Sequence, residues 1–370
     1  MPRLKILFVS AVPDFKGGAE VVLRAMLDNK LIEPVLAVPN DGPLAEAARA
    51  MGITVCSYNP GAMLRVHRPP RPGPMLAAAA DAIRCAFRLR ALAQEHGCSI
   101  IHSNGLKQHM LCAILGTLTR TKTLVHLHDI PYRRAERVIW KVIANRVSRV
   151  IMVSRPCYPS DTLPANVQVV PNGIAMACKT LPPARAPGPL RLGFVGRFHP
   201  NKGLDLLLDW FAAVRQHGPD ATLTIRGRPD PEMPDYWDRI RGRIRDEGLE
   251  PFVRQEGWVT GAATYAGLDI LLMSSKTPDP APLVVPEAMS AGVVVAGYPA
   301  GGIPGMIEDG VTGLLVESGA DLSRRLRSLM ETPGDFDRMR RSAYEHVKSE
   351  YSIAGFHARL LGVYQDMLGE

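Results

Sequence analysis

Short apolar runs alternate with longer helical patterns along almost the whole chain, and this alternation is the strongest constraint on its fold. Runs such as Leu4–Ser10 and Leu190–Val195 are too short for helices and rich in leucine and β-branched residues, as buried strands are. Between the runs, apolar residues recur at helical spacing, as in Leu204–His217. Strands separated by helices cannot pair as tight hairpins, so the pattern predicts an α/β fold with parallel sheets and helices on both faces.

The predicted strands form two groups, and each group predicts a doubly wound, Rossmann-like unit. They cover residues 4–10, 34–38, 54–57, 99–103, 122–128, 149–154 and 167–171, and then 190–195, 221–226, 253–256, 269–274, 293–297 and 313–316.

The boundary between the two groups is a proline-rich segment. Residues 181–189 have neither strand nor helix period, which predicts a linker. We therefore predict an N-terminal domain, a linker, a C-terminal domain and a final helix that crosses back to the first domain. Their ranges are 1–175, 176–189, 190–350 and 351–370. Ligands of such sheets bind beyond the carboxyl ends of the strands, so we expect the site in the cleft between the two domains.

The turn after the first strand of the second group, Gly196–Gly203, has the composition of a phosphate-binding loop. Glycine lets the backbone approach a ligand, a helix N-terminus attracts anions, and Arg197 and Lys202 can neutralise a diphosphate. The alternative is an ordinary strand–loop–helix corner with two solvated cations. A Walker loop is excluded because Gly-x-x-x-x-Gly-Lys-Ser/Thr is absent, and no strand ends in the Gly-x-Gly-x-x-Gly of a standard dinucleotide site.

Positive charge is concentrated in the first half of the chain. Residues 1–172 carry 22 Lys and Arg against 11 Asp and Glu, whereas residues 173–370 carry 22 against 25. The excess favours an anionic partner such as acidic lipid headgroups, and a solvated basic face is the alternative. The basic clusters lack interleaved aromatic residues, so we expect no nucleic-acid partner.

Composition predicts a globular, cytoplasmic protein. The chain is 46% hydrophobic and 22% charged, and no apolar run approaches the length of a membrane-spanning helix. The first apolar run is too short for a signal peptide. The six cysteines form no Cys-x-x-Cys pair, which favours free thiols over a metal site. We expect no cofactor, and we keep attachment to the cytoplasmic membrane face as an alternative to a fully soluble protein.

A second strand–loop–helix segment, residues 274–292, carries two carboxylates. Asp279 lies in the loop, and Glu287 lies in the first turn of the helix that follows. Both can accept hydrogen bonds from sugar hydroxyls or from a ribose diol. The alternative is a loop aspartate together with a glutamate that favours the helix dipole.

These segments, in this order, resemble the retaining family-4 glycosyltransferases of GT-B fold. The resemblance covers almost the whole chain. It rests on Gly17–Glu20, His128-Asp129, Pro171–Ile174, Gly196–Gly203, Asp279–Met289, Gly301–Pro304 and Asp309–Val316. It implies two Rossmann-like domains across a cleft and transfer of a sugar from a nucleotide diphosphate sugar.

The resemblance also implies roles for individual residues. Arg197 and Lys202 hold the diphosphate and stabilise the departing nucleotide, and Glu287 accepts from the ribose hydroxyls. Asp279 contacts the donor sugar, and His128 lies near the reacting carbon unless it is a core histidine. The other donor-side positions are Gly17, Gly18, Gly196, Gly227, Arg228, Trp258, Val259, Leu283 and Val284. The acceptor-side candidates are His102, Asn104, Arg133 and Arg134.

The family reaction implies that the cation pair is the main catalytic device. The sugar is transferred on one face, the leaving phosphate deprotonates the incoming hydroxyl, and no metal is required. Several residues depart from the family pattern. Asp279 replaces a usual glutamate, Ala281-Pro282 replaces an aromatic–glycine pair, Gly305 replaces an acid and Ala175 replaces an aspartate. These departures indicate an unusual donor or a weakened activity.

Three functions are consistent with the sequence. The first is transfer from a UDP- or GDP-linked sugar to a lipid-linked saccharide, in bacterial polysaccharide or glycolipid synthesis, with the basic half at the membrane. The second is transfer to a soluble sugar phosphate or small glycoside. The third is a nucleotide-sugar-binding protein without transfer activity that serves a partner enzyme.

Overall fold

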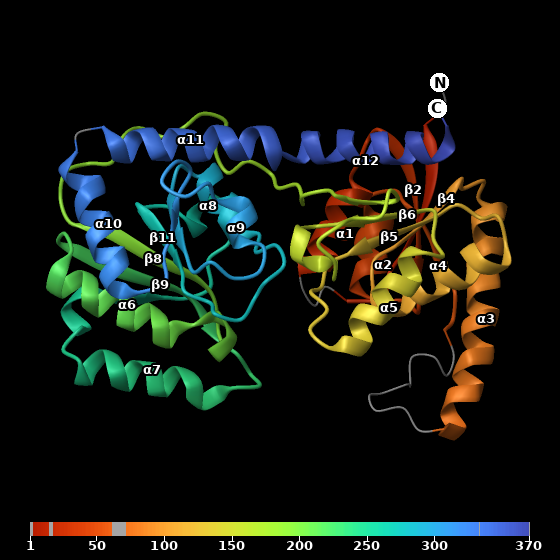
Figure 1. The fold of residues 1–370 in the computed structure, drawn as a ribbon, viewed down its shortest axis with the longest axis horizontal. Helices are drawn as coiled ribbons and strands as arrows, with labels where there is room; N and C mark the ends of the chain where they lie inside the picture. The colour runs from red at the N-terminus through yellow and green to blue at the C-terminus, as the bar shows by residue number, and fades with distance from the viewer. Residues whose placement is uncertain (1–2, 15–17, 61–71, 333, 370) are drawn as a thin grey trace. The chain divides into compact units, whose positions relative to one another are not determined.

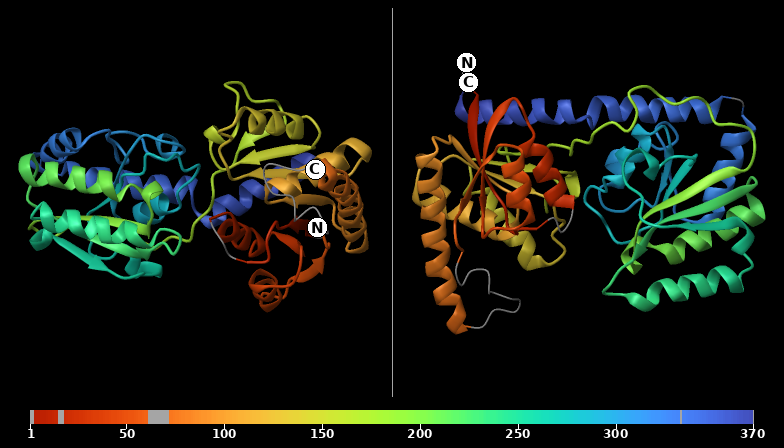
Figure 2. Two further views of the ribbon diagram at one scale, coloured as in Figure 1. Left: turned by 90° about the horizontal axis from the view of Figure 1, so that it is seen from below. Right: turned by 180° about the vertical axis from the view of Figure 1, so that it is seen from behind.

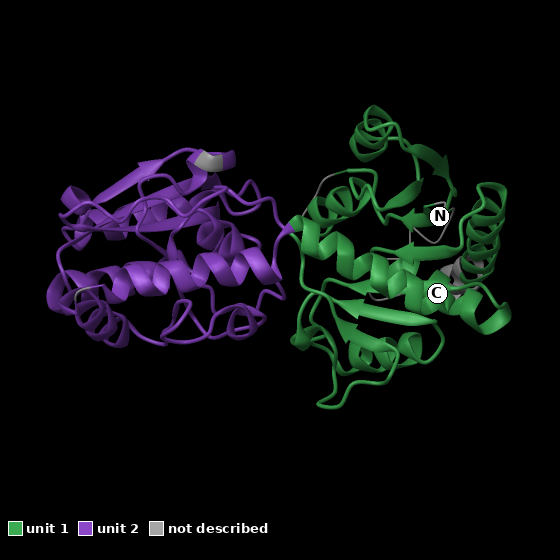
Figure 3. Cartoon of the chain, turned by 90° about the horizontal axis from the view of Figure 1, so that it is seen from above, with its two compact units in different colours: residues 1–173, 353–370 green, residues 174–352 purple. Residues whose placement is uncertain are grey.

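The structure is a computed structural model, and it describes residues 3–14, 18–60, 72–332 and 334–369 (Figure 1). The chain divides into two compact units. Unit 1 comprises residues 1–173 and 353–370, and unit 2 comprises residues 174–352 (Figure 3). Each unit is an open parallel sheet with helices on both faces (Figure 2), which confirms the predicted α/β class.

Unit 1 is built on a seven-stranded parallel sheet with the order β3-β2-β1-β4-β5-β6-β7. The strands are β1 (Leu4–Val9), β2 (Ile32–Val38), β3 (Thr54–Ser57), β4 (Ile100–Ser103), β5 (Thr123–Leu127), β6 (Arg149–Met152) and β7 (Val167–Val169). The helices are α1 (Gly18–Leu27), α2 (Pro43–Ala50), α3 (Pro72–Glu95), α4 (Leu106–Leu118), α5 (Arg134–Ala144) and α12 (Ile353–Leu368).

Unit 2 is built on a six-stranded parallel sheet with the order β10-β9-β8-β11-β12-β13. The strands are β8 (Leu190–Phe198), β9 (Ala221–Pro229), β10 (Val253–Glu256), β11 (Ile270–Met273), β12 (Val294–Gly297) and β13 (Leu314–Leu315). The helices are α6 (Leu204–His217), α7 (Pro234–Asp246), α8 (Val284–Ser290), α9 (Ile303–Met306), α10 (Gly319–Glu331) and α11 (Asp335–Glu350).

The strands lie where the apolar runs predict them, and their ends differ from the prediction by at most three residues. The largest difference is in β8 and β9, which continue three residues beyond the predicted ends because their pairing extends through Gly196↔Gly227 to Phe198↔Pro229. The central strands β4, β5, β11 and β12 are buried along their whole length, which explains why they read as continuous apolar runs. The strand order reverses between β1 and β4 and between β8 and β11, and loops diverge at these two switch points.

The C-terminal helix α12 packs in unit 1. The ring nitrogen Nε2 of His357 lies 2.8 Å from the Ala25 carbonyl oxygen of α1. Close packing continues at Gly173, where a Cβ would lie 2.5 Å from the Cβ of Phe356. Among the described residues, no helix is long and apolar enough to cross a membrane.

The proline-rich segment lies along unit 2 without regular secondary structure. The Ala177 amide donates to Ser290 Oγ of α8 at 3.1 Å. Two residues of α11 also reach the segment: the Tyr344 hydroxyl donates to the Cys178 carbonyl at 3.1 Å, and Arg340 donates to the Pro182 carbonyl at 2.9 Å. These bonds attach the segment to the second unit.

Four histidines lie in or against the core of unit 1. Burial lowers the pKa of His102 and His128 to about 3, and it holds the pKa of His109 and His126 well below the ordinary range. Both ring nitrogens of His126 are buried with no hydrogen-bond partner among the described residues. The folded unit therefore keeps these rings neutral at pH values where an unfolded chain would protonate them.

We expect unit 1 to lose stability as the pH falls from 7 to 5. The unfolded histidines bind protons near their ordinary pKa of about 6.5, whereas the folded ones stay neutral, so each contributes up to about 1.4 kcal/mol per pH unit. Urea unfolding at several pH values measures the slope. His126→Leu should lower the slope, and the exposed His217→Gln should not; equal slopes in all three proteins would contradict the assignment.

Candidate active site

The turn between β8 and α6 is fixed against the loop that follows β11. Gly203 adopts a left-handed conformation, with φ of +75°, and a Cβ there would lie 2.2 Å from the Ser274 carbonyl oxygen. Ser274 Oγ donates to the Gly203 carbonyl at 2.8 Å, and Ser275 Oγ donates to the Asn201 carbonyl. Glycine is therefore required at position 203 by both conformation and space. The contact lies at the switch point of the unit 2 sheet.

Arg197 at the end of β8 is held by a carboxylate that the sequence analysis did not single out. Its Nη1 donates to Asp230 Oδ2 at 2.8 Å, and the side chains are 58% and 4% exposed respectively. Asp230 follows β9 directly, and β9 pairs with β8, so both residues reach the same edge. The only signal in the sequence was an aspartate between two prolines, which matches no motif.

Lys202 and Asp279, both predicted as catalytic, form an ion pair. Nζ of Lys202 lies 3.2 Å from Asp279 Oδ2, and each side chain is about one-third exposed. The other oxygen of Asp279 accepts from the Ala281 amide at 3.2 Å. The pair joins the loops that follow β8 and β11.

The backbone of Asp279 is held by the Gly301-Gly302 turn. The Gly302 amide donates to the Asp279 carbonyl at 2.8 Å. Gly301 has φ of +61°, and a Cβ there would lie 2.2 Å from the same carbonyl oxygen. The close approach explains why the glycine pair stands in this turn, and it restricts where the Asp279 carboxylate can reach.

Glu287 in the first turn of α8 accepts a hydrogen bond from the Tyr265 hydroxyl at 2.7 Å. Burial raises the pKa of Glu287, and the bond from Tyr265 opposes this rise in part. Burial also raises the pKa of Tyr265, and the Glu287 carboxylate adds to the effect. Sequence reasoning missed Tyr265, because it lies in a loop without a motif.

Arg228 and Trp258 meet at the same edge of the sheet. The Arg228 guanidinium lies 5.1 Å from the centre of the Trp258 ring, which is 52% exposed. Gly227 approaches β8 so closely that a Cβ would lie 1.9 Å from the Gly196 carbonyl oxygen. An exposed indole beside a guanidinium offers a flat face on which a nucleotide base can stack.

The remaining predicted donor-side positions are placed as follows. Gly17 lies outside the described residues. Gly18 begins α1, and a Cβ there would meet no atom within 4 Å. The carbonyl of Val259 accepts from Thr264 Oγ1 at 3.2 Å. Leu283 caps the seven-residue helix α8, and Val284 is its first residue.

The carboxyl edge of unit 2 therefore gathers two cation–carboxylate pairs, a glutamate whose pKa is raised by burial and an exposed aromatic–guanidinium pair. A bound anion could replace Asp279 as the partner of Lys202, because phosphate oxygens accept the same hydrogen bonds. Within residues 3–14, 18–60, 72–332 and 334–369, no cluster of three or more His, Cys, Asp and Glu side chains is placed to hold a metal ion.

In unit 1, His128 is oriented by Asn104. Its Nε2 lies 2.6 Å from Asn104 Oδ1, and the amide group of Asn104 donates to the Ala19 carbonyl of α1 at 3.2 Å. Because the side-chain nitrogen of Asn104 faces Ala19, its side-chain oxygen faces His128. That oxygen can only accept a hydrogen bond, so Nε2 of His128 must carry the proton. The other ring nitrogen, Nδ1, is then an acceptor for a hydroxyl group. The ring also packs on His126, with centroids 4.1 Å apart.

The structure corrects the assignment of His102 to the acceptor side. His102 is 0% exposed, and its Nδ1 lies 2.7 Å from the hydroxyl of Tyr364 in α12. A fully buried ring that packs against Phe8 is not presented to an acceptor. Arg133 and Arg134, by contrast, are exposed at the start of α5.

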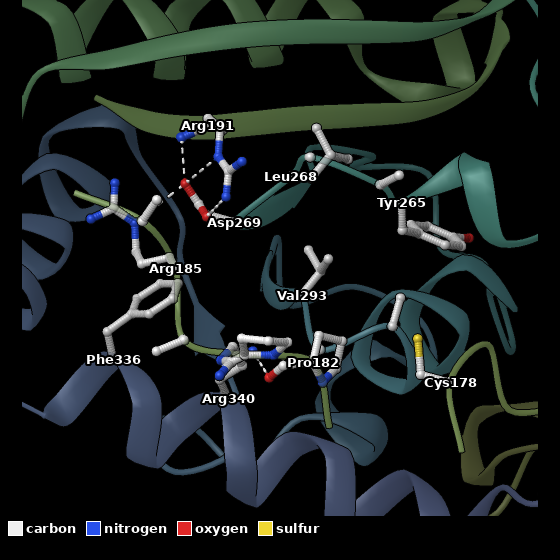
Figure 4. Close-up of a pocket in the computed structure, with 17 residues that line it drawn as sticks. Cys178, Pro182, Arg185, Arg191, Tyr265, Leu268, Asp269, Val293, Phe336 and Arg340 are labelled. Atoms are coloured by element: carbon white, nitrogen blue, oxygen red, sulfur yellow. Dashed lines mark hydrogen bonds and ion pairs between the residues drawn. The ribbon is translucent and has the colours of Figure 1, made fainter. Parts of the chain in front are cut away.

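A separate cavity of about 300 Å³ lies at the opposite, amino edge of the unit 2 sheet (Figure 4). The start of β8, the residues just before β11 and β12, the proline-rich segment and α11 line it. Two of its arginines face the Asp269 carboxylate: Arg191 makes a two-pronged contact at 2.6 and 3.1 Å, and Arg185 Nε lies 3.4 Å from Asp269 Oδ2. Ligands of doubly wound sheets bind at the carboxyl edge, so we do not assign the donor to this cavity.

The fold is that of known GT-B proteins. The structure is similar to Anabaena Alr3699/HepE in complex with UDP, with a TM-score of 0.77 and 21% identity, over 98% of this chain and 100% of that one. It is also similar to the lipopolysaccharide outer core galactosyltransferase WaaB, with a TM-score of 0.74 and 16% identity, over 98% and 99%. At these identities the likeness shows the fold alone, which is the predicted GT-B fold.

Two family models match the chain. The model described as Glycosyltransferase Family 4 matches residues 16–177, and the one described as Glycosyl transferases group 1 matches residues 189–332. Together they match most of the chain, and the chain therefore belongs to the family-4-like glycosyltransferases. The D-inositol 3-phosphate glycosyltransferase of Actinosynnema mirum is 30% identical over 209 residues, which are 52% of this chain and 49% of that protein. The chain spans about half or less of the length of the first curated relatives it matches.

We expect Glu287→Gln to stabilise the ligand-free protein more at pH 8 than at pH 5. Burial raises the pKa of Glu287, so the folded protein loses stability as the pH rises and the carboxylate ionises, whereas glutamine stays neutral and still accepts from Tyr265. Melting temperatures at the two pH values measure the difference. The exposed Glu331→Gln is the control. A Glu287→Gln protein that is less stable than the wild type at pH 8 would contradict the interpretation.

We expect Asn104→Asp to raise the pKa of His128, because a carboxylate beside Nε2 favours the charged imidazolium. In the wild type, a pKa of about 3 keeps His128 neutral between pH 5 and 8. Nuclear magnetic resonance titration of histidine-labelled protein measures the pKa of His128 in the wild type and in the variant. The His128 signal is the one that is missing from the spectrum of His128→Gln. Asn104→Leu should leave the ring neutral. Titration of His128 near pH 6.5 in the wild type would show that the assignment is wrong.

Proposed function

We propose that this protein is a retaining glycosyltransferase that moves a sugar from a nucleotide diphosphate sugar to an acceptor hydroxyl. The observation that carries the proposal is the cluster at the carboxyl edge of unit 2. Arg197 and Lys202 lie near the two ends of the Gly196–Gly203 turn, and Glu287 lies in α8, which follows β11 across the switch point. Two cations and a carboxylate suit a diphosphate and a ribose diol.

In this proposal the two cations stabilise the leaving group. The bond between the anomeric carbon and the diphosphate oxygen breaks, and the diphosphate gains negative charge. The acceptor oxygen bonds to the same face of that carbon and gives its proton to a leaving phosphate oxygen. Arg197 and Lys202, rather than a metal ion, neutralise the developing charge, as positioned donors do at an oxyanion.

The remaining residues orient the donor. Glu287 accepts from the ribose, and the Arg228–Trp258 pair stacks the base. His128 accepts from a sugar hydroxyl through Nδ1, which the contact with Asn104 leaves unprotonated. The gathering of Arg228 and Trp258 at the carboxyl edge supports this arrangement.

The donor-sugar pocket differs from the family pattern at Asp279. The shorter side chain is held by Lys202, by the Ala281 amide and by the Gly301-Gly302 turn. Donor binding must therefore part Lys202 from Asp279 before the lysine can pair with the diphosphate. We propose that this exchange frees the carboxylate to accept from the donor sugar.

The proposed acceptor is a lipid-linked saccharide, presented to the basic first half of the chain at an anionic membrane face. A soluble sugar phosphate is the second candidate, because the matched relatives include enzymes named for D-inositol 3-phosphate. The basic residues of the first half suit either anionic acceptor. Transfer without lipid would favour the second candidate, and nucleotide-sugar binding without transfer would favour a non-catalytic role.

We expect Lys202→Ala and Arg197→Ala each to lower turnover at least tenfold. A charged contact to the leaving group contributes more than about 1.4 kcal/mol to transition-state stabilisation. Release of nucleotide from the donor measures turnover, and Arg338→Ala, at an exposed arginine of α11, is the control. Wild-type rates in both variants would refute the proposed role of the cations.

The donor is identified by thermal-shift screening with UDP, GDP, TDP and ADP sugars. At equal concentration, a ligand that binds the native state more tightly raises the melting temperature more, so the preferred base should stand out. UDP is the first to test, because the similar structure of HepE holds it. If none of the four classes shifts the melting temperature, the proposed donor site is wrong.

A further inference from the structure

Helix α5 presents an apolar stripe to solvent. Val138, Ile139 and Val142 are 60%, 36% and 51% exposed, and helical geometry places them on one side of the helix. Trp140 and Ile143, on the other side, are buried. A three-residue aliphatic stripe that no other part of the described chain covers is unusual on a helix that already has a buried face.

Basic residues flank this stripe. Arg134, Arg137 and Lys141 recur at helical spacing on the same helix, and all three are exposed. Within the described part of the chain, none of the three lies in ion-pair distance of a carboxylate. We call these three residues, with Val138, Ile139 and Val142, the α5 outer face.

Helix α7 in unit 2 is also rich in arginine, but two of its arginines form ion pairs with carboxylates of the same unit. Arg239 pairs with Asp205 at 2.6 Å, and Arg243 pairs with Asp209 at 2.9 Å and with Glu247 at 2.7 Å. The α5 outer face has no comparable partners among the described residues. Its charges are therefore available to an external anion.

The neighbouring helices extend the apolar character. Helix α4 contacts both α3 and α5. Half of the large apolar side chains that the described residues expose lie on these three helices: Ile83, Phe87, Met110, Leu118, Val138, Ile139 and Val142. Scattered exposed apolar residues are ordinary, but concentration on adjacent helices marks an interaction surface.

We propose that the α5 outer face docks on an anionic lipid surface. This inference rests on the proposed lipid-linked acceptor. Aliphatic side chains can enter the boundary between headgroups and acyl chains, while arginine and lysine at the edge of the stripe pair with lipid phosphates. A protein partner would need matching carboxylates, whereas a lipid surface satisfies the apolar and the basic groups together.

The location of the helix fits this role. Helix α5 begins shortly after His128; of the acceptor-side candidates, Arg133 is its N-cap residue and Arg134 is its first residue. Docking through α5 would bring a membrane next to the residues that we assign to the acceptor. A lipid-linked saccharide could then reach them without leaving the membrane.

The test is co-sedimentation of the full chain with vesicles of phosphatidylglycerol and phosphatidylcholine in equal parts, and with phosphatidylcholine alone. The first variant is Val138→Gln/Ile139→Gln/Val142→Gln, and the second is Arg137→Gln/Lys141→Gln. Glutamine keeps the helix propensity at these exposed positions. The matched controls are Val21→Gln, which is exposed on α1, and Arg338→Gln/Lys348→Gln, which are exposed on α11.

We expect the wild type to bind the anionic vesicles and to lose binding in 1 M salt. The Arg137/Lys141 variant should lower the partition coefficient at least tenfold, because each cation near an anionic surface contributes a factor of about five. The Val138/Ile139/Val142 variant should also lower it at least tenfold, because three aliphatic side chains can then no longer enter the boundary between headgroups and acyl chains. The controls should bind like the wild type. Wild-type binding by both α5 variants, or no binding by the wild type, would overturn the proposal.

Two further measurements separate this proposal from the proposed function. Nucleotide binding, measured by calorimetry on the same preparations, should be unchanged in the variants and also shows that they are folded. A variant that loses vesicle binding but keeps nucleotide binding supports the α5 outer face as the docking surface. A wild type that does not bind nucleotide would count against the proposed donor site alone. If the wild type is a dimer and the α5 variants are monomers, the α5 outer face binds a second copy of the chain instead, and the proposal is overturned.

Discussion

The close approach of Gly203 to the Ser274 carbonyl is the constraint on which the unit 2 site depends. It brings the loops that follow β8 and β11 into direct contact at the point where the strand order reverses. Lys202 stands beside this contact and Asp279 lies a few residues beyond it, so the ion pair between them is a consequence of the glycine turn. Any side chain at position 203 would have to push α6 or the Ser274 backbone aside.

Arg197 and Lys202 are held by their carboxylate partners in different ways. Asp230 is buried, so its bond to Arg197 resists exchange and orients the guanidinium before any ligand arrives. Asp279 and Lys202 are both partly exposed, and a pair of this kind contributes only about 0–1 kcal/mol. Arg197 is therefore preorganised, whereas Lys202 can readily change partners.

The two units use the same strand order for different chemistry. Unit 2 concentrates charge at its carboxyl edge, while unit 1 places a neutral histidine, oriented by Asn104, at the end of β5. Burial keeps His128 neutral, which suits an acceptor of hydrogen bonds rather than a general acid. Part of the positive charge of unit 1 lies on α5, where Arg134, Arg137 and Lys141 form no ion pair with a carboxylate of the described residues.

Periodicity in the sequence was sufficient to predict both sheets, because a strand or helix depends on neighbours within a few residues. Arg197 at the end of β8 and Glu287 in the first turn of α8 could be located by the same local patterns, whereas Asp279 lies in the loop between β11 and α8. The partners Asp230 and Tyr265 were not predictable, because no local pattern shows which loops become neighbours once the strands are ordered.

The case of His102 shows the same limit. Its position at a strand end indicated an exposed site residue, but Tyr364 of α12, 262 positions away, covers it. The sequence by itself determined the α/β class, the approximate strand positions and the residue types in the Gly196–Gly203 turn. Only the tertiary structure decided which cation each carboxylate holds, which histidine is exposed and which apolar stripe stays uncovered, because these depend on contacts between segments that are distant in the chain.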